Sequence, residues 1–310
     1  MISFVIPCYN SSQTIGDVVE EIEQAMSKYN RGYEIILVND SSKDNTVDVI
    51  KDICMKHNNI TGVNLVKNFG QHAALMAGFH YVNGDIIVCM DDDGQTPADE
   101  AYKLIEQIES GHDVVYARYA VKKHKAYRNF GSKLNDLMTR IMLGKPKGLY
   151  VSSYFAIKRL LIDEIIQYSN PYPYVIGLVL RSTKDIVNVD VNHRERQVGT
   201  SGYTISKLIA LWMNGFTAFS VIPLRMATAC GAFIAILGFA YGIVTIIRKL
   251  IGINYILGYS GIMSALMFIG GLILLMLGII GEYIGRIYIS LNKSPQFIVR
   301  EVFGTNSHET

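Results

Sequence analysis

The sequence SFVIPCYN at residues 3–10 is a short apolar run that ends abruptly in polar residues. The segments EIILVNDSS at residues 34–42 and IIVCMDDDG at residues 86–94 repeat this arrangement. Short runs that are apolar without alternation are typical of strands buried on both faces. The strands predicted on this basis are Ser3–Pro7, Glu34–Asn39, Gly62–Val66, Asp85–Met90 and Asp113–Ala117.

Helical patterns separate these strands. Apolar residues recur at helical spacing between Ile15 and Met26, a second helix follows Asp44, and a third opens at Thr96-Pro97, with proline at the first helical position. Strand–helix–strand repetition predicts an α/β domain with a Rossmann-like, mostly parallel sheet covered by helices on both faces. Ligands bind at the carboxyl ends of the strands in such sheets, so the polar residues that follow the strands are the candidate site.

The C-terminal part of the chain is far more apolar. Residues 226–281 contain only two charged residues, Arg248 and Lys249, which predicts two membrane-spanning helices joined as a hairpin. The preceding stretch is apolar but interrupted by polar residues, which favours an interfacial amphipathic position. The predicted organisation is an α/β domain over 1–202, an interfacial segment over 203–224, a hairpin region over 225–286 with spans at 226–247 and 256–281, and a C-terminal tail over 287–310.

Composition narrows the function and the compartment. The 310 residues are 18% charged with a net charge of +2, which disfavours a nucleic-acid binder that relies on bulk charge. The four cysteines lie far apart and form no CxxC motif, which fits a reducing compartment and argues against structural zinc. No leader pattern precedes the first strand, and Arg225 and Arg286 flank the predicted hairpin. We therefore expect the α/β domain and the tail to be cytoplasmic.

Asp91-Asp92-Asp93 is the strongest local signal of chemistry. Adjacent carboxylates at a strand end repel one another and need a cation or strong solvation. In an extended stretch Asp91 and Asp93 point the same way, which would suit a hard divalent ion such as Mg²⁺ together with substrate phosphates. A solvated acidic loop is the alternative, and Asp40 at the end of another strand weighs against it.

Basic residues follow the domain's fifth predicted strand. They are Lys122, Lys123, Lys125, Arg128, Lys133, Arg140, Lys145 and Lys147. Of these, Arg128 and Lys133, together with Arg118, would suit a phosphate headgroup at the membrane boundary, because arginine binds phosphate in a bidentate manner. A solvated basic face is the alternative interpretation of this stretch. The cluster His193-Arg194-Glu195-Arg196 could likewise be an exposed strand end.

Five motifs in order carry a resemblance. They are VIPCYN at 5–10, VNDSSKDNT at 38–46, KNFGQHAALMAG at 67–78, MDDDGQTPADE at 90–100 and HRERQVGTSGYT at 193–204. The first four resemble the family 2 glycosyltransferases with a GT-A fold. The fifth, with two spans after it, is similar to the polyprenyl-phosphate glycosyltransferases, which include dolichyl-phosphate mannose synthase and bacterial undecaprenyl-phosphate sugar transferases. The match covers essentially residues 2–300.

The resemblance implies a role for each matching residue. The donor-binding positions are Pro7, Tyr9, Asn10, Asp40, Lys67, Asp91, Asp92 and Gln95. The acceptor phosphate would be held by Arg118, Arg128 and Ser132. Asp93, together with Asp91, would bind Mg²⁺ or Mn²⁺, and the catalytic set would be Asp91, Asp93, Arg128 and Arg196.

Ser152-Ser153 departs from the family pattern, because many relatives carry an Asp in this segment as a proposed base. General-base help is worth typically 10²–10⁴-fold for a hydroxyl. A phosphate monoester has a second pKa of about 6 and is already anionic at pH 7, so a lipid phosphate acceptor would not need a base. A metal ion and basic residues would instead bring the two anions together and stabilise the leaving diphosphate.

The resemblance thus implies transfer of a single sugar from a nucleotide sugar, with UDP as the expected carrier, to undecaprenyl phosphate, with inversion. It also implies a multi-pass protein of the bacterial cytoplasmic membrane that forms a homo-oligomer, such as a tetramer. Two alternatives stay open. A processive polysaccharide synthase typically carries a Q-x-x-R-W motif and more spans, whereas the single Trp212 lies in ALWMN. A non-catalytic nucleotide-binding scaffold is disfavoured by the intact Asp91 and Asp93.

Overall fold

The computed structural model describes residues 1–29, 31–119, 140, 145–192, 259–291 and 294–304, together with isolated positions from 229 to 251. The chain forms two compact units, one of Met1–Leu208 with Lys293–Thr310 and one of Ile209–Asn292. The expected interfacial segment 203–224 lies outside the described residues, and the first expected span, 226–247, is described only at isolated positions.

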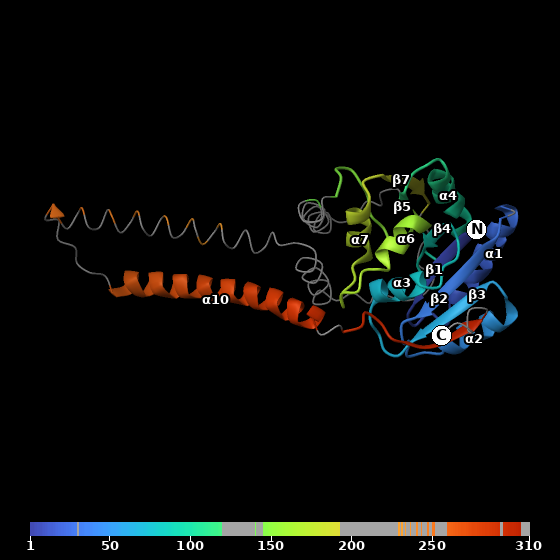
Figure 1. Ribbon diagram of the computed structural model, residues 1–310, viewed down its shortest axis with the longest axis horizontal. Coiled ribbons are helices and arrows are strands. Elements are labelled where there is room, and N and C mark those ends of the chain that lie inside the picture. The colour runs from blue at the N-terminus through green and yellow to red at the C-terminus, as the bar shows by residue number, and fades with distance from the viewer. Residues whose placement is uncertain are drawn as a thin grey trace. The chain divides into compact units, whose positions relative to one another are not determined.

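Strands and helices alternate along the first unit, as the apolar runs predict (Figure 1). The strands are β1 (Ile2–Cys8), β2 (Tyr33–Asn39), β3 (Ile60–Leu65), β4 (Ile86–Cys89), β5 (Val114–Tyr119), β6 (Phe155–Lys158), β7 (Ile186–Val191) and β8 (Val299–Gly304). The helices are α1 (Ile15–Tyr29), α2 (Thr46–Lys56), α3 (Gln71–Phe79), α4 (Ala101–Glu109), α6 (Arg159–Ile165) and α7 (Val175–Ser182). Pro97 precedes the 3₁₀ turn Ala98–Glu100 and is not the first residue of α4.

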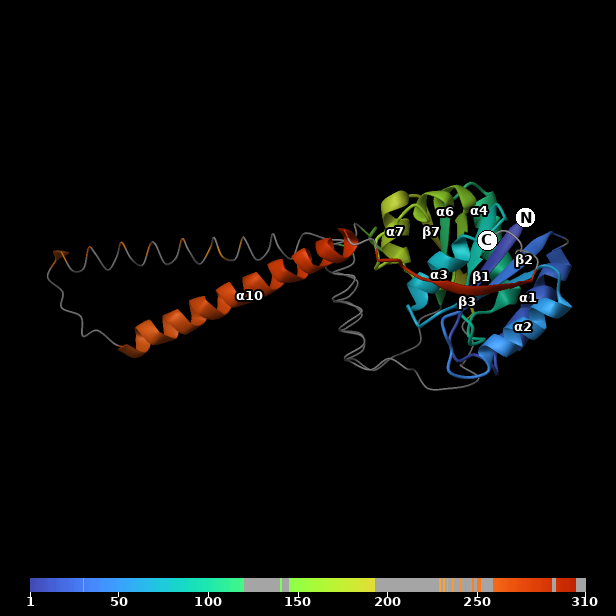
Figure 2. The ribbon, with the colours of Figure 1, turned by 60° about the horizontal axis from the view of Figure 1, so that its bottom comes forward.

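The strands form one eight-stranded sheet in the order β7-β5-β6-β4-β1-β2-β3-β8. The ladders β1–β2, β1–β4, β2–β3 and β5–β7 are parallel, which confirms a mostly parallel sheet. Two antiparallel strands were not predicted. One is β6, which lies between β4 and β5, and the other is β8, which pairs with the outer edge of β3 (Figure 2).

Helices cover both faces of the sheet. Phe4, Leu37 and Val88 share one buried cluster with apolar residues of α1, α2 and α4. On the other face α3 approaches so closely that a Cβ at Gly78 would lie 2.6 Å from Val5 Cγ1. Apolar residues on both faces of β1 and β2 are therefore buried, which is the arrangement that continuous apolar runs predict.

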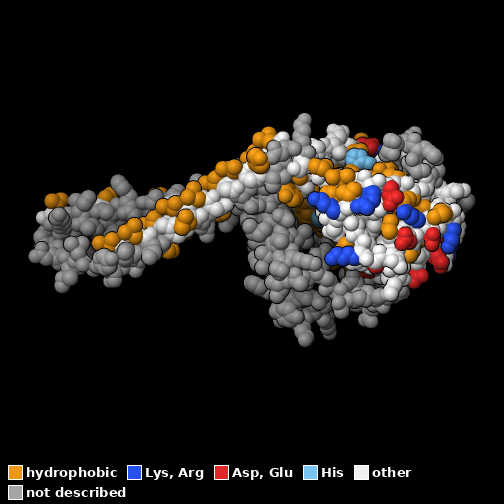
Figure 3. Space-filling model, turned by 90° about the horizontal axis from the view of Figure 1, so that it is seen from below, with side chains coloured by type: hydrophobic (Ala, Val, Ile, Leu, Met, Phe, Trp, Pro, Cys, Tyr) orange, Lys and Arg blue, Asp and Glu red, His pale blue; other side chains and the backbone are white. Residues whose placement is uncertain are grey.

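The second unit contains the long helix α10 (Tyr259–Leu291). In the part of the chain that the structure describes, it is the one helix long and apolar enough to cross a membrane, with its most apolar window at Phe268–Gly285. Large apolar side chains such as Leu266, Leu274 and Ile284 are exposed along it. Figure 3 shows hydrophobic side chains along the length of this helix. The helix begins three residues after, and extends ten residues beyond, the expected span 256–281.

Candidate active site

Polar loops from four strands meet at one edge of the sheet, which we call the carboxyl edge. Tyr9 and Asn10 follow β1, Asp40 follows β2, and the Asp91–Asp93 triplet follows β4. Ser153 precedes β6, which runs antiparallel and therefore starts at the same edge. The predicted candidate residues that follow β1, β2 and β4 therefore lie at this one edge. Ser153, which precedes a strand, lies there as well.

Asp91 is held by two side chains from distant parts of the sequence. Gln71 Nε2, at the start of α3, donates a hydrogen bond of 3.0 Å to Asp91 Oδ1, and Ser153 Oγ donates one to Oδ2. Burial raises the pKa of Asp91 to about 6; the Ser153 hydrogen bond opposes this shift, and the neighbouring Asp93 and Asp92 add to it. The carboxylate is therefore ordered but carries a charge that its surroundings do not fully compensate.

Asp92 joins the loop after β1 to the loop after β4. The backbone N–H of Tyr9 donates to Asp92 Oδ2 at 3.0 Å, and Thr14 Oγ1 donates to the Asp92 carbonyl oxygen at 2.6 Å. Burial raises the pKa of Asp92, against the hydrogen bond from Tyr9. One of its carboxylate oxygens thus accepts from protein backbone, which is a positioning contact.

Asp40 is buried and fixes the loop that leads into α3. The backbone N–H groups of Phe69 and Gly70 donate to its two carboxylate oxygens at 2.7 and 2.8 Å. Burial raises its pKa, and these two hydrogen bonds lower it. Gly70 has a φ of 92°, a conformation that glycine adopts without a steric penalty. Asp40 therefore positions Gln71, which in turn contacts Asp91.

The loop after Asp93 turns sharply. The backbone N–H of Gln95 donates to Asp93 Oδ1 at 3.1 Å, and Gly94 has a φ of 71°. Among the described residues no group of three or more His, Cys, Asp or Glu side chains forms a metal site. Asp91 and Asp93 are the kind of carboxylates that could hold a divalent ion whose other oxygen ligands come from a substrate or water, and the burial that raises the pKa of Asp91 would make a cation favourable beside it.

The other predicted site residues are arranged as follows. Pro7 is half-buried at the end of β1, and the Lys67 ammonium lies 5.0 Å from the centre of the Phe69 ring. Arg118 on β5 makes a two-pronged ion pair with Asp190 on β7, through contacts of 2.6 and 2.9 Å. Its guanidinium is therefore engaged within the protein. Arg128, Ser132 and Arg196 lie outside the described residues.

The structure adds Gln71, Thr14 and Ser153 to the predicted set. Gln71 and Ser153 both lie in segments that the sequence motifs had singled out, but only the folded chain shows their contact with Asp91. Ser152 Oγ, by contrast, lies 2.8 Å from the carbonyl oxygens of Ala117 and Tyr154, so it supports the backbone between β5 and β6.

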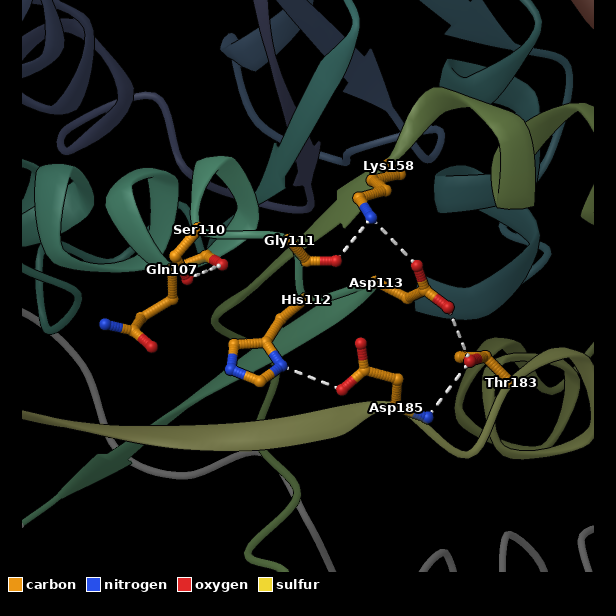
Figure 4. Close-up of polar contacts among 8 residues, drawn as sticks. All are labelled: Gln107, Ser110, Gly111, His112, Asp113, Lys158, Thr183 and Asp185. Carbon is orange, nitrogen blue, oxygen red and sulfur yellow. Dashed lines mark hydrogen bonds and ion pairs between the residues drawn. The ribbon is translucent and has the colours of Figure 1, made fainter.

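A second polar cluster lies at the opposite edge of the sheet, where β5 and β7 begin (Figure 4). Lys158 Nζ contacts Asp113 at 3.0 Å and the Gly111 carbonyl oxygen, while Thr183 Oγ1 donates to the other Asp113 oxygen at 2.8 Å. His112 Nδ1 lies 2.8 Å from Asp185 Oδ1. We call this edge the amino edge.

Comparison with known proteins agrees with a glycosyltransferase fold. Residues 3–166 match the family model described as glycosyl transferase family 2, and residues 222–287 match the GtrB C-terminal hairpin. A glucosyl-3-phosphoglycerate synthase structure from Mycobacterium tuberculosis, in complex with Mn²⁺ and UDP-glucose, aligns with a TM-score of 0.50 and 20% identity over 70% of this chain and 77% of that one. At this identity the likeness concerns the fold.

Curated relatives extend the match to nearly the whole chain. A Photorhabdus laumondii protein named undecaprenyl-phosphate 4-deoxy-4-formamido-L-arabinose transferase is 32% identical, covering 98% of this chain and 95% of its own. A Proteus mirabilis protein of the same name is 31% identical, covering 98% and 94%. The chain belongs to glycosyl transferase family 2, and its activity is glycosyl transfer.

Proposed function

We propose that this enzyme transfers one sugar from a nucleotide sugar, UDP-linked, to undecaprenyl phosphate, with inversion at the anomeric carbon. The acceptor class follows from the curated relatives of the same length. The observation that carries the proposal is the pairing of Asp91 with Ser153 at the carboxyl edge. At the position where a base would be expected, the chain has a hydroxyl that donates to a carboxylate.

This arrangement suits an acceptor that is already ionised. The Ser153 hydroxyl donates a hydrogen bond to Asp91, and a neutral hydroxyl in this role does not remove a proton from an acceptor. A lipid phosphate with a second pKa of about 6 brings its own anionic oxygen to the sugar at pH 7. The remaining difficulty is the charge of the departing diphosphate.

Different residues at the carboxyl edge would bind different parts of the nucleotide-sugar donor. Tyr9, Asn10 and Asp40 lie at the strand ends where the nucleoside would bind, and Asp91 and Asp93 face the diphosphate. A divalent cation held by Asp91 and Asp93, Mg²⁺ or Mn²⁺, would supply positive charge that stabilises the leaving nucleoside diphosphate. Arg118, Arg128, Ser132 and Arg196 remain proposals for the acceptor and diphosphate contacts.

The same proposal assigns a location. An undecaprenyl chain does not leave a bilayer readily, since each buried CH₂ contributes about 0.8 kcal/mol to membrane binding. The catalytic unit therefore works at the cytoplasmic face of a bacterial membrane, attached through the segment that matches the hairpin family and through α10. We propose a multi-pass protein and a homo-oligomer, for which cross-linking in native membranes is the test.

The test is nucleoside diphosphate release from purified protein in detergent with undecaprenyl phosphate and Mn²⁺. The donor panel contains UDP- and GDP-sugars, including UDP-linked 4-deoxy-4-formamido-L-arabinose, and Asp93→Ala is the control. Release that requires both the lipid and Asp93, with one sugar per lipid by mass spectrometry, is the expected result. Long glycan chains would favour a processive synthase, and nucleotide binding without release from any donor would favour a non-catalytic scaffold.

A further inference from the structure

Two buried asparagines lie side by side at the ends of β2 and β3. Asn39 is 3% exposed and Asn64 is 8% exposed, and they are partners in the parallel ladder. Asn39 Nδ2 donates to Asn64 Oδ1 at 2.8 Å. A buried side-chain amide needs partners for both its oxygen and its nitrogen, so each asparagine must find a second contact.

Those second contacts extend the row in both directions. Asn64 Nδ2 donates to Glu301 Oε1 on β8 at 2.9 Å. At the other end Ser42 Oγ donates to Asn39 Oδ1 at 2.5 Å, and the backbone N–H of Asn10 donates to Ser42 Oγ at 2.9 Å. The result is one continuous row of hydrogen bonds from the C-terminal strand to the loop after β1, which we call the polar row.

The two ends of the polar row are chemically complementary. A backbone N–H can only donate and a carboxylate can only accept, whereas the hydroxyl and the two amides between them do both. The direction of every hydrogen bond in the row is therefore set by its ends. Glu301, as the acceptor-only end, fixes the orientation of Asn64 and through it the orientation of Asn39.

The row ends in backbone that requires support. Asn10 and Ser41 have φ values of 55° and 54°, a left-handed conformation that costs free energy in residues other than glycine. The Asn10 side chain also accepts a hydrogen bond of 2.8 Å from the backbone N–H of Lys43. Asn10, Ser41 and Lys43 therefore form two interlocked turns at the carboxyl edge, and Ser42 holds them to the sheet.

We propose that Glu301 is a positioning residue for the donor site, acting through the polar row from a strand that follows α10 in the sequence. This inference rests on the proposed function, because it assigns the loop after β1 to donor binding. The Glu301 carboxylate acts as a hydrogen-bond acceptor for Asn64. Its ion pair with Lys51, at 3.5 Å between side chains that are 35% and 39% exposed, is not required.

The experiment compares four variants of the full chain in detergent. Glu301→Ala removes the acceptor, and Glu301→Gln keeps a side-chain oxygen. Lys51→Met removes the ion pair together with the contact of the Lys51 ammonium with the Phe303 ring, which lies 4.7 Å away, and leaves the polar row intact. Ser42→Ala breaks the row at its other end. Donor KM and kcat are measured beside amide hydrogen exchange of the peptide 9–12. The exchange measurement needs no turnover, so it decides on the row even if the donor or acceptor has been assigned wrongly.

We expect Glu301→Ala to raise donor KM by about three- to tenfold at unchanged kcat, the range for loss of one hydrogen bond, and to speed exchange at residues 9–12. Glu301→Gln and Lys51→Met should resemble the wild type. The variant with both Glu301→Ala and Ser42→Ala should match Ser42→Ala alone, because both break one row.

Three results would overturn the proposal. The first is an additive effect of Glu301→Ala and Ser42→Ala on donor KM and on exchange. Additivity would also result if Glu301→Ala detached β8 from β3, because that effect would not pass through the row. The second is a Glu301→Gln variant that behaves like Glu301→Ala, since charge and not acceptance would then matter. The third is unchanged exchange at residues 9–12 in Glu301→Ala.

Discussion

The two edges of the sheet treat their carboxylates in opposite ways. At the amino edge Asp85, Asp113 and Asp185 each meet a basic group: the N-terminal ammonium at 2.9 Å, Lys158 at 3.0 Å and His112 at 2.8 Å. At the carboxyl edge Asp40 and Asp91 accept hydrogen bonds from neutral amides and a hydroxyl, and form no ion pair within the described residues.

The pKa directions follow this difference. The hydrogen bond from Lys158 is the largest cause that lowers the pKa of Asp113, whereas burial raises the pKa of Asp91 to about 6. The Lys158–Asp113 pair at the amino edge therefore contributes to stability. Within the described residues no basic side chain pairs with Asp40 or Asp91 at the carboxyl edge, and we propose that a divalent cation supplies the positive charge there. Replacements at the carboxyl edge should therefore lower turnover, whereas replacements at the amino edge should lower stability and leave turnover unchanged.

The largest effect on turnover is expected for Asp91→Asn. Loss of one charged group that acts on the leaving diphosphate should lower kcat/KM by about 10²- to 10³-fold in the nucleoside diphosphate release assay. Because the folded pKa of Asp91 lies above its unfolded value, the ionised group opposes folding, and this cost grows as pH rises from about 4 through 6.

Without metal, the Asp91→Asn protein should consequently be more stable than the wild type at pH 7.5 and melt at a higher temperature. The gain in the free energy of unfolding should be at most about 3 kcal/mol. The free energies of unfolding of the two proteins should converge below about pH 3, where Asp91 is largely protonated in both the folded and the unfolded state. A variant that keeps full turnover, or one that is less stable at pH 7.5, would contradict the comparison.

Ser153→Asp is expected to have the next largest effect. It would restore the carboxylate that many relatives carry in this segment, but beside Asp91 the two like charges would repel. We expect kcat/KM to fall about tenfold, while Ser153→Ala lowers it about threefold. A gain in kcat for Ser153→Asp would mean that the acceptor does need a base, and the anionic acceptor would then be the wrong assignment.

Replacements of Asp92 test whether a carboxylate at the carboxyl edge acts through its negative charge or as a hydrogen-bond acceptor. Asp92→Ala removes the acceptor for the Tyr9 N–H and should raise donor KM about fivefold, in line with one lost hydrogen bond. Asp92→Asn retains an oxygen and should stay within about twofold of the wild type. Equal loss in both variants would show instead that the charge of Asp92 contacts the donor or its cation.

Lys158→Met is the matched replacement at the amino edge and should leave kcat/KM unchanged. The pair with Asp113 is about a third exposed, so its loss should lower the free energy of unfolding by only about 0.5–1 kcal/mol at pH 7. Because the folded pKa of Asp113 is depressed, this stabilisation is present above about pH 4 and disappears below it. Thermal melts at pH 7 and pH 3 check both statements.

The sequence predicts the strands that are buried on both faces, because a continuous apolar run specifies β1, β2 and β4 without reference to their partners. It does not predict β8, whose residues VREVFG include two charges and whose partner β3 lies more than 230 residues earlier. The short strand β6 was missed because four residues carry little periodic signal.

The residues of the candidate site likewise fall into those that the sequence predicts and those that only the folded chain reveals. The Asp91–Asp93 triplet and Asp40 were found because they directly follow strands. Gln71 and Ser153 were not, since their contact with Asp91 joins segments 20 and 62 positions away. The resemblance implies an acceptor-phosphate role for Arg118, which stays a prediction; its ion pair with Asp190 on β7 could not be predicted because Asp190 is 72 positions further along the chain.

The pairing of β8 with β3 also constrains how the chain is threaded through a lipid bilayer. Both strands belong to one sheet, yet α10 lies between them in the sequence. Hydrogen bonds between strands cannot form across a hydrocarbon layer, so residues 60–65 and 299–304 must lie on the same side of it. A chain that leaves this side and returns to it crosses an even number of times. If α10 spans the bilayer, a second crossing must therefore occur between β3 and β8.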